Sequence, residues 1–525
     1  MMLHTPSSWR GMTTSPHHLA SQSGLDILKD GGTAIEAAVA MAATLSVVYP
    51  HMDSIGGDSF WLVREPDGRI HSVHGCGAAA QKADLPLYRG LANVPWRGPL
   101  AANTVAGTLS AWEVLLATGP GRMSLDRLLR DAIFYGEDGV SVTKGGGDIA
   151  HSKDGELKDV FGYAQAFRPD GKPLGEGDRL KQPALAQTFR RLAKSGLSAF
   201  YDGAVARDIS ADLAEAGSPV GAADLAAHRA TTPQPLSAGV RGARLYNSAP
   251  PTQGAASLLI LALFDRLKVE TMDDFDFVHG LVEATKQAFL IRDAHIGDPA
   301  YMAFDLHALL ADEDALDALA ARIDPRRALA WPHLPDGGDT VWFGAMDGEG
   351  RAVSAIQSTY FEFGSGLVLP QTGIIWQNRG ASFRLAEAGW NALRPGRKPF
   401  HTLNPALAVF DDGRVLAYGT MGGEGQPQTQ AAVFSRYRHG VPLQAAITAP
   451  RWLLGRTWGE DSVTLKLENR FDAGLYDALR TAGHQVELLP EFTSVMGHAG
   501  ALVRHGDGRF EGATDPRSDG SVGTW

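Results

Sequence analysis

The chain has 525 residues, of which 44% are hydrophobic and 20% are charged, a composition typical of folded globular proteins and not of disordered chains. Its formal net charge is −11, and the basic residues form no stripe that could neutralise phosphates, so a nucleic-acid partner is not expected. The single cysteine, Cys76, excludes an internal disulfide framework and any CxxC-type zinc or redox site.

Membrane and export signals are not predicted. Residues 1–18 are polar and lack the apolar core of a secretory signal. The most apolar stretches, 34–48 and 255–264, are shorter than the ~20 residues that span a bilayer. We therefore expect a soluble cytoplasmic protein that does not contact membranes.

The first elements of the chain are predicted to be two helices. One covers about 19–29 and ends at Gly31-Gly32. Thr33 and Glu36 then form a capping box for a second helix, which runs to residue 48 and stops before Pro50. Ala, Val, Leu and Met cover nearly all faces of this second helix, so we expect it to be buried between other layers.

Strand-like runs follow in pairs around short turns, which is typical of β-hairpins. The pairs are 59–64 with 69–74, 340–346 with 351–358, and 406–410 with 415–419. Helices are predicted at 108–116, 180–195 and 278–296, and loops at 144–177 and 323–338. Because hairpins build antiparallel sheets, the pattern predicts an α+β fold with antiparallel sheets and helices packed outside them.

Short chemical motifs give little on their own. The chain lacks the signatures of P-loop nucleotide sites, zinc proteases, serine hydrolases and EF-hands, so we predict no cofactor and no metal. Residues 75–80 loosely fit a dinucleotide motif, but they follow a hairpin strand instead of opening a βαβ unit. His17-His18 has no ligand partner at metal-site spacing and indicates a surface pair.

Longer motifs occur in one order along the whole chain. They are Ala20-Ser21-Gln22-Ser23-Gly24, Gly31–Ala34, Pro50-His51-Met52, Gly56-Gly57-Asp58, Ala249–Gly254, Glu283-Ala284 with Lys286 and Ala288, Gly297-Asp298-Pro299, Gly338-Asp339-Thr340, Asn404-Pro405, Gly422-Gly423, Ala449-Pro450-Arg451 and Asp515-Pro516-Arg517. In this order they resemble the gamma-glutamyltranspeptidase family of N-terminal nucleophile hydrolases.

The resemblance implies a four-layer αββα sandwich that is made as an inactive precursor and cuts itself between Asp339 and Thr340. The products would be an α chain of residues 1–339 and a β chain of residues 340–525, which stay together as one folded unit, either a heterodimer or a dimer of such heterodimers. Thr340 would be the nucleophile. Its new α-amine, with an ordinary pKa of about 7.7–8.0, would be the base that the precursor lacks.

Other site residues also follow from the resemblance. The amides of Gly422 and Gly423 would hold the oxyanion of the reacting carbonyl, and glycine lets the backbone come close to a ligand. Ser358 lies where the family has a threonine that hydrogen-bonds the nucleophile. Alternatively, Ser358 is an ordinary inward-facing residue of a strand with no role in catalysis.

The substrate-binding positions depart from the family pattern. Gamma-glutamyl enzymes hold the substrate carboxylate with an arginine in the segment matching 74–80, which has none here. The two amine acceptors that follow Asn378 are replaced by Arg379 and Ser382. His401-Thr402 replaces a serine pair, and Tyr360 replaces an asparagine. Arginine has five donors and no acceptor, so Arg379 should reject an ammonium and attract an anion, unless it forms a structural ion pair at the site edge.

Three functions follow. The resemblance is greatest to the oxamate amidohydrolase branch, which implies hydrolysis of a small carboxylated amide such as oxamate to oxalate and ammonia, a step of purine breakdown. A gamma-glutamyltransferase or glutathione hydrolase with a rearranged pocket is the second. A catalytically inactive member that acts as a binding protein is the third, and the intact Asp339-Thr340 and Gly422-Gly423 argue against it.

Overall fold

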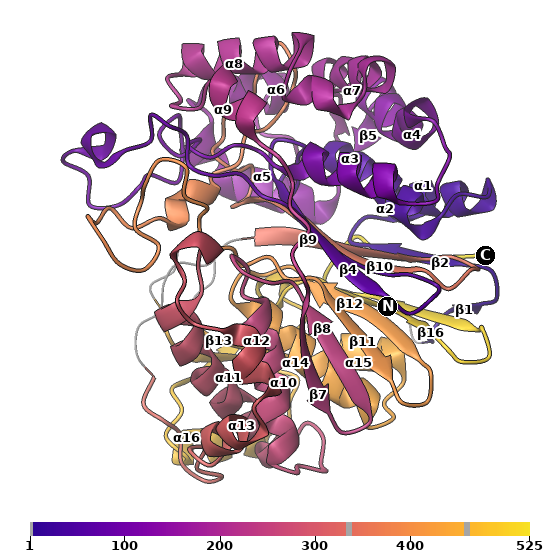
Figure 1. Ribbon diagram of the computed structural model, residues 1–525, viewed down its shortest axis with the longest axis vertical. Helices are drawn as coiled ribbons and strands as arrows, with labels where there is room; N and C mark the ends of the chain where they lie inside the picture. Colours follow the sequence, from indigo (N-terminus) through magenta and orange to yellow (C-terminus); the bar gives the residue numbers. More distant parts are fainter. Residues whose placement is uncertain (1–3, 332–338, 456–461) are drawn as a thin grey trace.

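Two antiparallel sheets stack face to face and are covered by helices on both outer sides (Figure 1). The computed structural model describes residues 4–331, 339–455 and 462–525. The four-layer αββα architecture of N-terminal nucleophile hydrolases is thereby confirmed. Among the described residues, no helix combines the length and the apolar character needed to cross a membrane.

The first sheet has six strands. Their order is β18 (Ser521–Thr524), β2 (Met12–Ser15), β9 (Asp339–Met346), β10 (Ala352–Tyr360), β3 (Asp58–Arg64) and β4 (Ile70–Gly75). The second sheet has seven, in the order β1 (Ser7–Ser8), β17 (Phe510–Thr514), β16 (Ala499–Arg504), β12 (Val415–Thr420), β11 (Ala406–Phe410), β8 (Ala243–Asn247) and β7 (Leu236–Val240). Each sheet therefore mixes strands from before and after the Asp339–Thr340 peptide.

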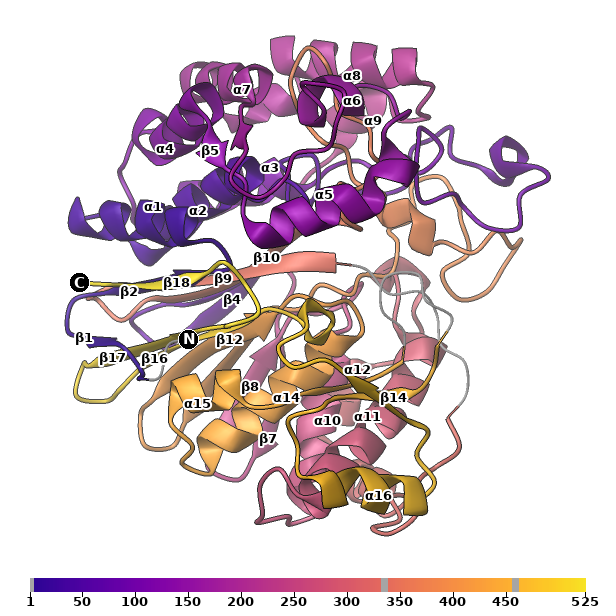
Figure 2. The ribbon, with the colours of Figure 1, turned by 180° about the vertical axis from the view of Figure 1, so that it is seen from behind.

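Helices from the first part of the chain cover the six-stranded sheet (Figure 2). This side contains α1 (His18–Lys29), α2 (Ala34–Val48), α3 (Thr108–Thr118), α4 (Leu125–Asp138), α5 (Lys144–Leu157), α6 (Tyr163–Phe167), α7 (Pro183–Ser195), α8 (Ala204–Ala216) and α9 (Ala222–Ala227). A small ribbon of β5 (Val140–Ser141) and β6 (Arg179–Leu180) lies among them.

The seven-stranded sheet is covered by helices from the middle and the end of the chain (Figure 1). They are α10 (Gly254–Arg266), α11 (Phe275–His295), α12 (Leu306–Ala311), α13 (Glu313–Ala320), α14 (Gly425–Arg438), α15 (Leu443–Thr448) and α16 (Ala473–Thr481). A three-stranded sheet of β13 (Trp452–Leu454), β14 (Leu465–Glu468) and β15 (Val486–Leu489) accompanies this layer.

Among the described residues, three larger apolar cores and one small cluster around Phe60 and Trp342 hold the layers together. One lies between the first helices and the six-stranded sheet, and a second lies between the later helices and the seven-stranded sheet. A third, smaller one fills the space between the sheets with residues such as Met12, Leu62 and Leu407. Every residue of α2 is buried, because this helix is enclosed by α1, α4 and the first sheet. Thr33 and Glu36 form its capping box, as predicted.

Two predictions about the first half of the chain were wrong. Residues 144–177 contain α5 and α6, not a continuous loop, because Thr143 caps α5 and its apolar residues Ala150 and Leu157 are buried despite the run of glycines. His17 is buried, not on the surface. Its Nδ1 accepts a hydrogen bond from the amide of Leu19 and so caps α1.

Of the predicted loop 323–338, residues 332–338 lie outside the described residues, while 323–331 form neither helix nor strand. The predicted helix 180–195 begins at Pro183, because Leu180 pairs with Val140 in the small ribbon. The three predicted hairpins are confirmed, with strands bounded within two residues of the predicted ends.

Candidate active site

Thr340 is buried near the start of β9, where the ladder with β10 is irregular. Val341 pairs with Gln357 and Asp339 pairs with Tyr360, so Thr340 alone faces two residues, Ser358 and Thr359. This is the pattern of a β-bulge, a feature that re-aims side chains and is common beside active sites. The Nε2 of Gln426, at the start of α14, lies 3.5 Å from the Thr340 hydroxyl oxygen.

Three neighbouring strands bring predicted and unpredicted residues together at this point. Ser358 of β10 pairs directly with Asp58 of β3, and cross-strand partners share one face of a sheet. The Ser358 hydroxyl accepts a hydrogen bond of 2.8 Å from the amide of Tyr360. Thr340, Ser358 and Asp58 therefore lie on adjacent strands near the same ends, and Asp58 is a site residue that the sequence analysis did not select.

Tyr360 and Arg379 form a stacked pair. Tyr360 ends β10 with a φ of +87°, a backbone conformation that is unusual for a tyrosine and marks a constrained site. The guanidinium carbon of Arg379 lies 3.7 Å from the centre of the Tyr360 ring. Both side chains are buried, so the cation–π contact is a desolvated one.

Arg379 has few polar partners for a buried cation. Its two Nη atoms lie 3.4 and 3.5 Å from the Thr402 hydroxyl, which makes both hydrogen bonds long. No carboxylate lies within ion-pair distance of it among the described residues, which does not fit the alternative of a structural ion pair. Burial lowers the pKa of Arg379 to about 10, which leaves the guanidinium charged at neutral pH.

Asp58 is the anionic neighbour of this cation. Burial raises the pKa of Asp58 to about 7, and the charge of Arg379 opposes that shift. One carboxylate oxygen accepts hydrogen bonds from the amides of Gly77 and Gly107 and from the Gln377 side chain. The other oxygen lies 3.3 Å from Nε2 of His401, without hydrogen-bond alignment.

The wall around these charges is aromatic and neutral. His401 and His74 each lie 4.9 Å, centre to centre, from the ring of Phe60. Burial lowers the pKa of His74 to about 3 and that of His401 well below its usual range, so both rings are uncharged at neutral pH. The charge of Lys398, a residue not selected from the sequence, also lowers the pKa of both histidines.

The loop of Gly422 and Gly423 connects β12 to α14. Both glycines have positive φ, +114° and +52°, a region that side chains disfavour. Among the described residues, neither amide N–H has a hydrogen-bond acceptor. Two free amides next to the start of a helix are suited to bind a developing negative charge.

Gln253 connects the two sides of the site. Its Nε2 donates to the carbonyl of Thr402 at 2.7 Å and to that of Gly423 at 2.8 Å. Its Oε1 accepts from Arg292, which also donates to Glu424. The glutamine lies in the motif Ala249–Gly254, so the sequence marked its position, but nothing in the motif indicated this bridge.

Two of the predicted substrate-binding residues are held by other parts of the chain. The Asn378 side chain accepts from the amide of Phe361 and donates to the carbonyl of Trp96, so both of its polar ends are used. Ser382 donates to the carbonyl of Phe400 at 3.3 Å. The structure thus brings Arg379, Tyr360, Thr402 and His401 together, while Asn378 shapes the backbone beside them.

The family model for "Gamma-glutamyltranspeptidase" matches residues 20–525. The chain belongs to the gamma-glutamyltranspeptidase family. An oxamate amidohydrolase proenzyme from Klebsiella pneumoniae subsp. pneumoniae is 52% identical over 98% of both chains. A glutathione hydrolase-like YwrD proenzyme from Bacillus subtilis is 40% identical over 97% of this chain and 98% of its own length. The crystal structure of a cephalosporin acylase from Bacillus halodurans superimposes with a TM-score of 0.92 at 31% identity, covering 100% of this chain and 97% of that one.

As a member of the gamma-glutamyltranspeptidase family, the chain shares its architecture with relatives whose names cover several amide substrates. Fold and family therefore do not select the substrate. That choice depends on the residues around Arg379.

Proposed function

We propose that this chain is a self-processing amidohydrolase that uses Thr340 to hydrolyse a small amide whose carboxylate lies next to the scissile carbonyl, with oxamate as the substrate. The buried Arg379 carries this proposal, because it is a charged group whose two long hydrogen bonds leave its donors available to an anion. The 52% identical relative named as an oxamate amidohydrolase proenzyme supports the same substrate.

Processing comes first in this proposal. In the unbroken chain the nitrogen of Thr340 belongs to the peptide bond with Asp339 and cannot act as a base. Attack of the Thr340 hydroxyl on the Asp339 carbonyl carbon breaks this C–N bond and forms an ester. Breaking the C–N bond frees the α-amine of Thr340. Water then hydrolyses the ester, which restores the Thr340 hydroxyl and yields chains 1–339 and 340–525.

The same hydroxyl then acts on the substrate. The Thr340 oxygen attacks the amide carbon of oxamate, and the α-amine takes the hydroxyl proton and passes it to the departing ammonia. The amides of Gly422 and Gly423 hold the negative carbonyl oxygen, and loss of one such donor typically costs about 10²–10³ in rate. Arg379 binds the carboxylate. Water then hydrolyses the oxalyl ester, which releases oxalate.

Competition between substrate classes tests the proposal. We expect purified, cleaved protein to have a higher kcat/KM for oxamate than for a gamma-glutamyl anilide, because the ammonium of the latter would meet a guanidinium. Arg379→Ala should lose roughly ten- to a hundredfold in kcat/KM for oxamate, since it removes charge-assisted hydrogen bonds. Ammonia release and anilide absorbance measure the two reactions.

Controls separate the alternatives. Thr340→Ala should remain one chain on a denaturing gel and release no ammonia, while N-terminal sequencing of the smaller wild-type fragment should begin at Thr340. A higher kcat/KM for the gamma-glutamyl anilide than for oxamate would instead identify the chain as a gamma-glutamyl enzyme. An uncut wild-type protein without activity would instead identify an inactive family member.

A further inference from the structure

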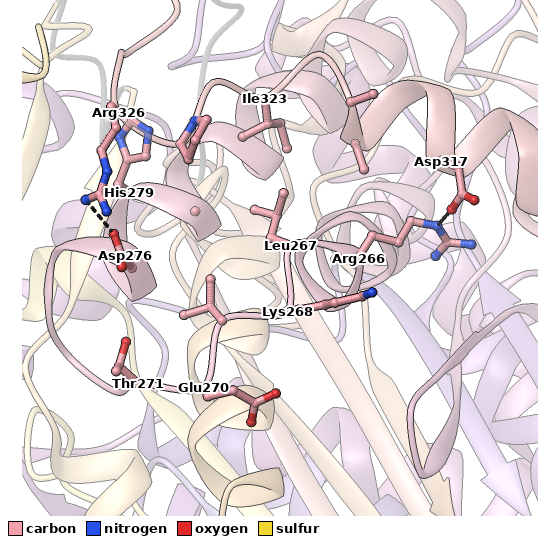
Figure 3. Close-up of a pocket in the computed structure, with 15 residues that line it drawn as sticks. Arg266, Leu267, Lys268, Glu270, Thr271, Asp276, His279, Asp317, Ile323 and Arg326 are labelled. Atoms are coloured by element: carbon pink, nitrogen blue, oxygen red, sulfur yellow. Dashed lines mark hydrogen bonds and ion pairs between the residues drawn. The ribbon is translucent and has the colours of Figure 1, made fainter.

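In the helical layer outside the seven-stranded sheet, residues of α10, α11 and α13, together with 267–271 and 321–326, line an open cavity of about 740 Å³ (Figure 3). His279 of α11 reaches its wall, and Arg326 forms an ion pair of 3.0 Å with Asp276 at the start of the same helix. Segment 323–326 is part of the stretch of chain that leads to Asp339.

Behind this wall lies a buried trio of metal-ligating types, His279, Glu283 and His484, whose ligand atoms are within 4.8 Å of one another. Their atoms are used by hydrogen bonds. Nε2 of His279 donates to the carbonyl of Asp324 at 2.8 Å, so its Nδ1 accepts from His484 at 2.9 Å. The ammonium of Lys286 lies 2.6 Å from Glu283, where it would repel a metal cation. His279 and Glu283 of this trio therefore bind the backbone of a neighbouring segment, at Asp324 and Leu329, by hydrogen bonds.

Glu283 and Lys286 grip one residue by its backbone, and we name this pair the Leu329 clamp. Lys286 donates to the carbonyl of Leu329 at 2.7 Å, and the amide of Leu329 donates to Glu283 at 3.0 Å. Both charged side chains are 2% exposed, so the grip is made in a desolvated place. The side chain of Leu329 itself is 41% exposed, which means that the clamp recognises the backbone and not the leucine.

Neighbouring contacts fix the direction of the chain. The amide of Ala328 donates to the carbonyl of Ala482 at 2.8 Å, and the rings of Trp331 and Phe289 are 6.4 Å apart. His279, Glu283, Lys286 and Phe289 lie along α11 at spacings of three and four residues, which places them on one face of the helix. One helix face therefore holds residues 324–331.

We propose that the Leu329 clamp is a positioning device for self-cleavage, which fixes the point from which the chain runs to the Asp339–Thr340 peptide. The inference rests on the proposed function, because it presumes cleavage there. Leu329 is ten residues before Asp339, and ten residues span at most about 33–36 Å. Holding Leu329 limits the conformational freedom of the stretch that precedes the scissile peptide, and small errors in placing reacting atoms cost large factors in rate.

The test follows the conversion of full-length precursor to two chains on denaturing gels. Lys286→Met removes the donor that binds the Leu329 carbonyl. Leu329→Pro removes the N–H that donates to Glu283 and leaves the ion pair between Glu283 and Lys286 in place. We expect both variants to lengthen the half-time of cleavage roughly ten- to a hundredfold. Leu329→Ala is the matched control, since it keeps both backbone contacts, and it should be cleaved at the wild-type rate.

Activity per cleaved molecule separates positioning from a general defect. Once cut, both variants should show the wild-type kcat and KM for oxamate, because neither contact reaches Thr340. Wild-type half-times in Lys286→Met and Leu329→Pro would overturn the clamp, and so would a fall in kcat that parallels slower cleavage. A wild-type chain that never cleaves would overturn the proposed function and the clamp together, which distinguishes the two failures.

Discussion

Asp58 is a carboxylate buried beside a guanidinium, and its ionisation changes the charge that an anionic substrate meets. Burial raises the pKa of Asp58 to about 7, while Arg379 stays charged well above that pH. Below pH 7 Asp58 is mostly neutral, and the cation acts alone. As the pH rises through about 7, Asp58 gains a negative charge that opposes the substrate carboxylate.

We therefore predict that KM for oxamate rises above pH 7 by up to about tenfold per pH unit, because binding then requires proton uptake by one group. Asp58→Asn should remove this rise, since the amide is isosteric and cannot ionise. Initial rates between about pH 6 and pH 9 give KM and kcat separately. A KM that rises equally steeply in Asp58→Asn would assign the effect to another group.

The loop of Gly422 and Gly423 packs against the backbone at Gly497. A Cβ on Gly422 would lie 3.3 Å from the Cα of Gly497, so these backbones are in close contact. Arg451 donates to the carbonyls of Met496 and Gly497 at 3.2 and 3.0 Å and pairs with Asp515 at 2.6 Å. Burial alone would raise the pKa of Asp515, but Arg451 and Arg517 hold it below its usual range.

Arg451→Lys should therefore lower kcat while leaving KM for oxamate nearly unchanged. A lysine keeps a positive charge near Asp515, but it lacks the two-armed guanidinium, in which Nη1 donates to the carbonyls of Met496 and Gly497 while Nη2 contacts Ile447 and Asp515. We expect a loss of roughly ten- to a hundredfold in kcat, comparable to weakening one oxyanion donor. Steady-state kinetics with oxamate measure it. An unchanged kcat would mean that the loop keeps its geometry without Arg451.

At the scale of elements, the sequence predicted those helices and strands whose ends depend on residues a few positions apart. The hairpins and the capping box of Thr33 and Glu36 were found because turn residues and side-chain caps act within a few positions. Residues 144–157 were missed because their helix depends on burial against distant segments, which outweighs the low helix propensity of its four glycines.

The site residues also fall into two groups, those that the sequence motifs selected and those whose contacts only the structure shows. The motif order of the chain selected Thr340, Gly422 and Gly423, whose backbone surroundings suit their predicted roles. The contact of Asp58 with His401 was not predictable, since it joins residues far apart in sequence. The stacking of Arg379 on Tyr360 depends on a positive φ at a tyrosine, which no sequence pattern indicates.

For the whole molecule, buried histidines outnumber the buried carboxyl groups that would compensate them on acidification. Burial lowers the pKa of seven histidines, His17, His51, His74, His228, His401, His484 and His498. Burial raises the pKa of three aspartates, Asp53 and Asp58 to about 7 and Asp519 by an amount that leaves it above its ordinary value. Below their ordinary pKa of 6.5 these histidines bind protons more readily in the unfolded chain, which favours unfolding.

We accordingly predict that Tm falls steadily as the pH drops from about 6.5 towards 4. Each neutral histidine contributes up to about 1.4 kcal/mol of lost stability per pH unit in that range. The three aspartates have the opposite effect on stability, since their raised pKa means that they bind protons more readily in the folded state, but they are fewer. Differential scanning fluorimetry across this range measures Tm. A constant Tm would show that the histidines stay solvated.

The interleaved strand order has a consequence for the two chains that the proposed cleavage would give. In the six-stranded sheet, β2, β3 and β4 come from before the Asp339–Thr340 peptide, while β18, β9 and β10 come from its other side; β2 lies between β18 and β9, and β10 pairs with β3. Separation of two cut chains would break ladder hydrogen bonds along several strands at once, which amounts to unfolding. We therefore expect that dilution would not dissociate the two chains, that loss of activity would follow first-order kinetics whatever the protein concentration, and that mixed populations would not exchange chains. Each cleaved molecule would keep for its lifetime the partner it was synthesised with.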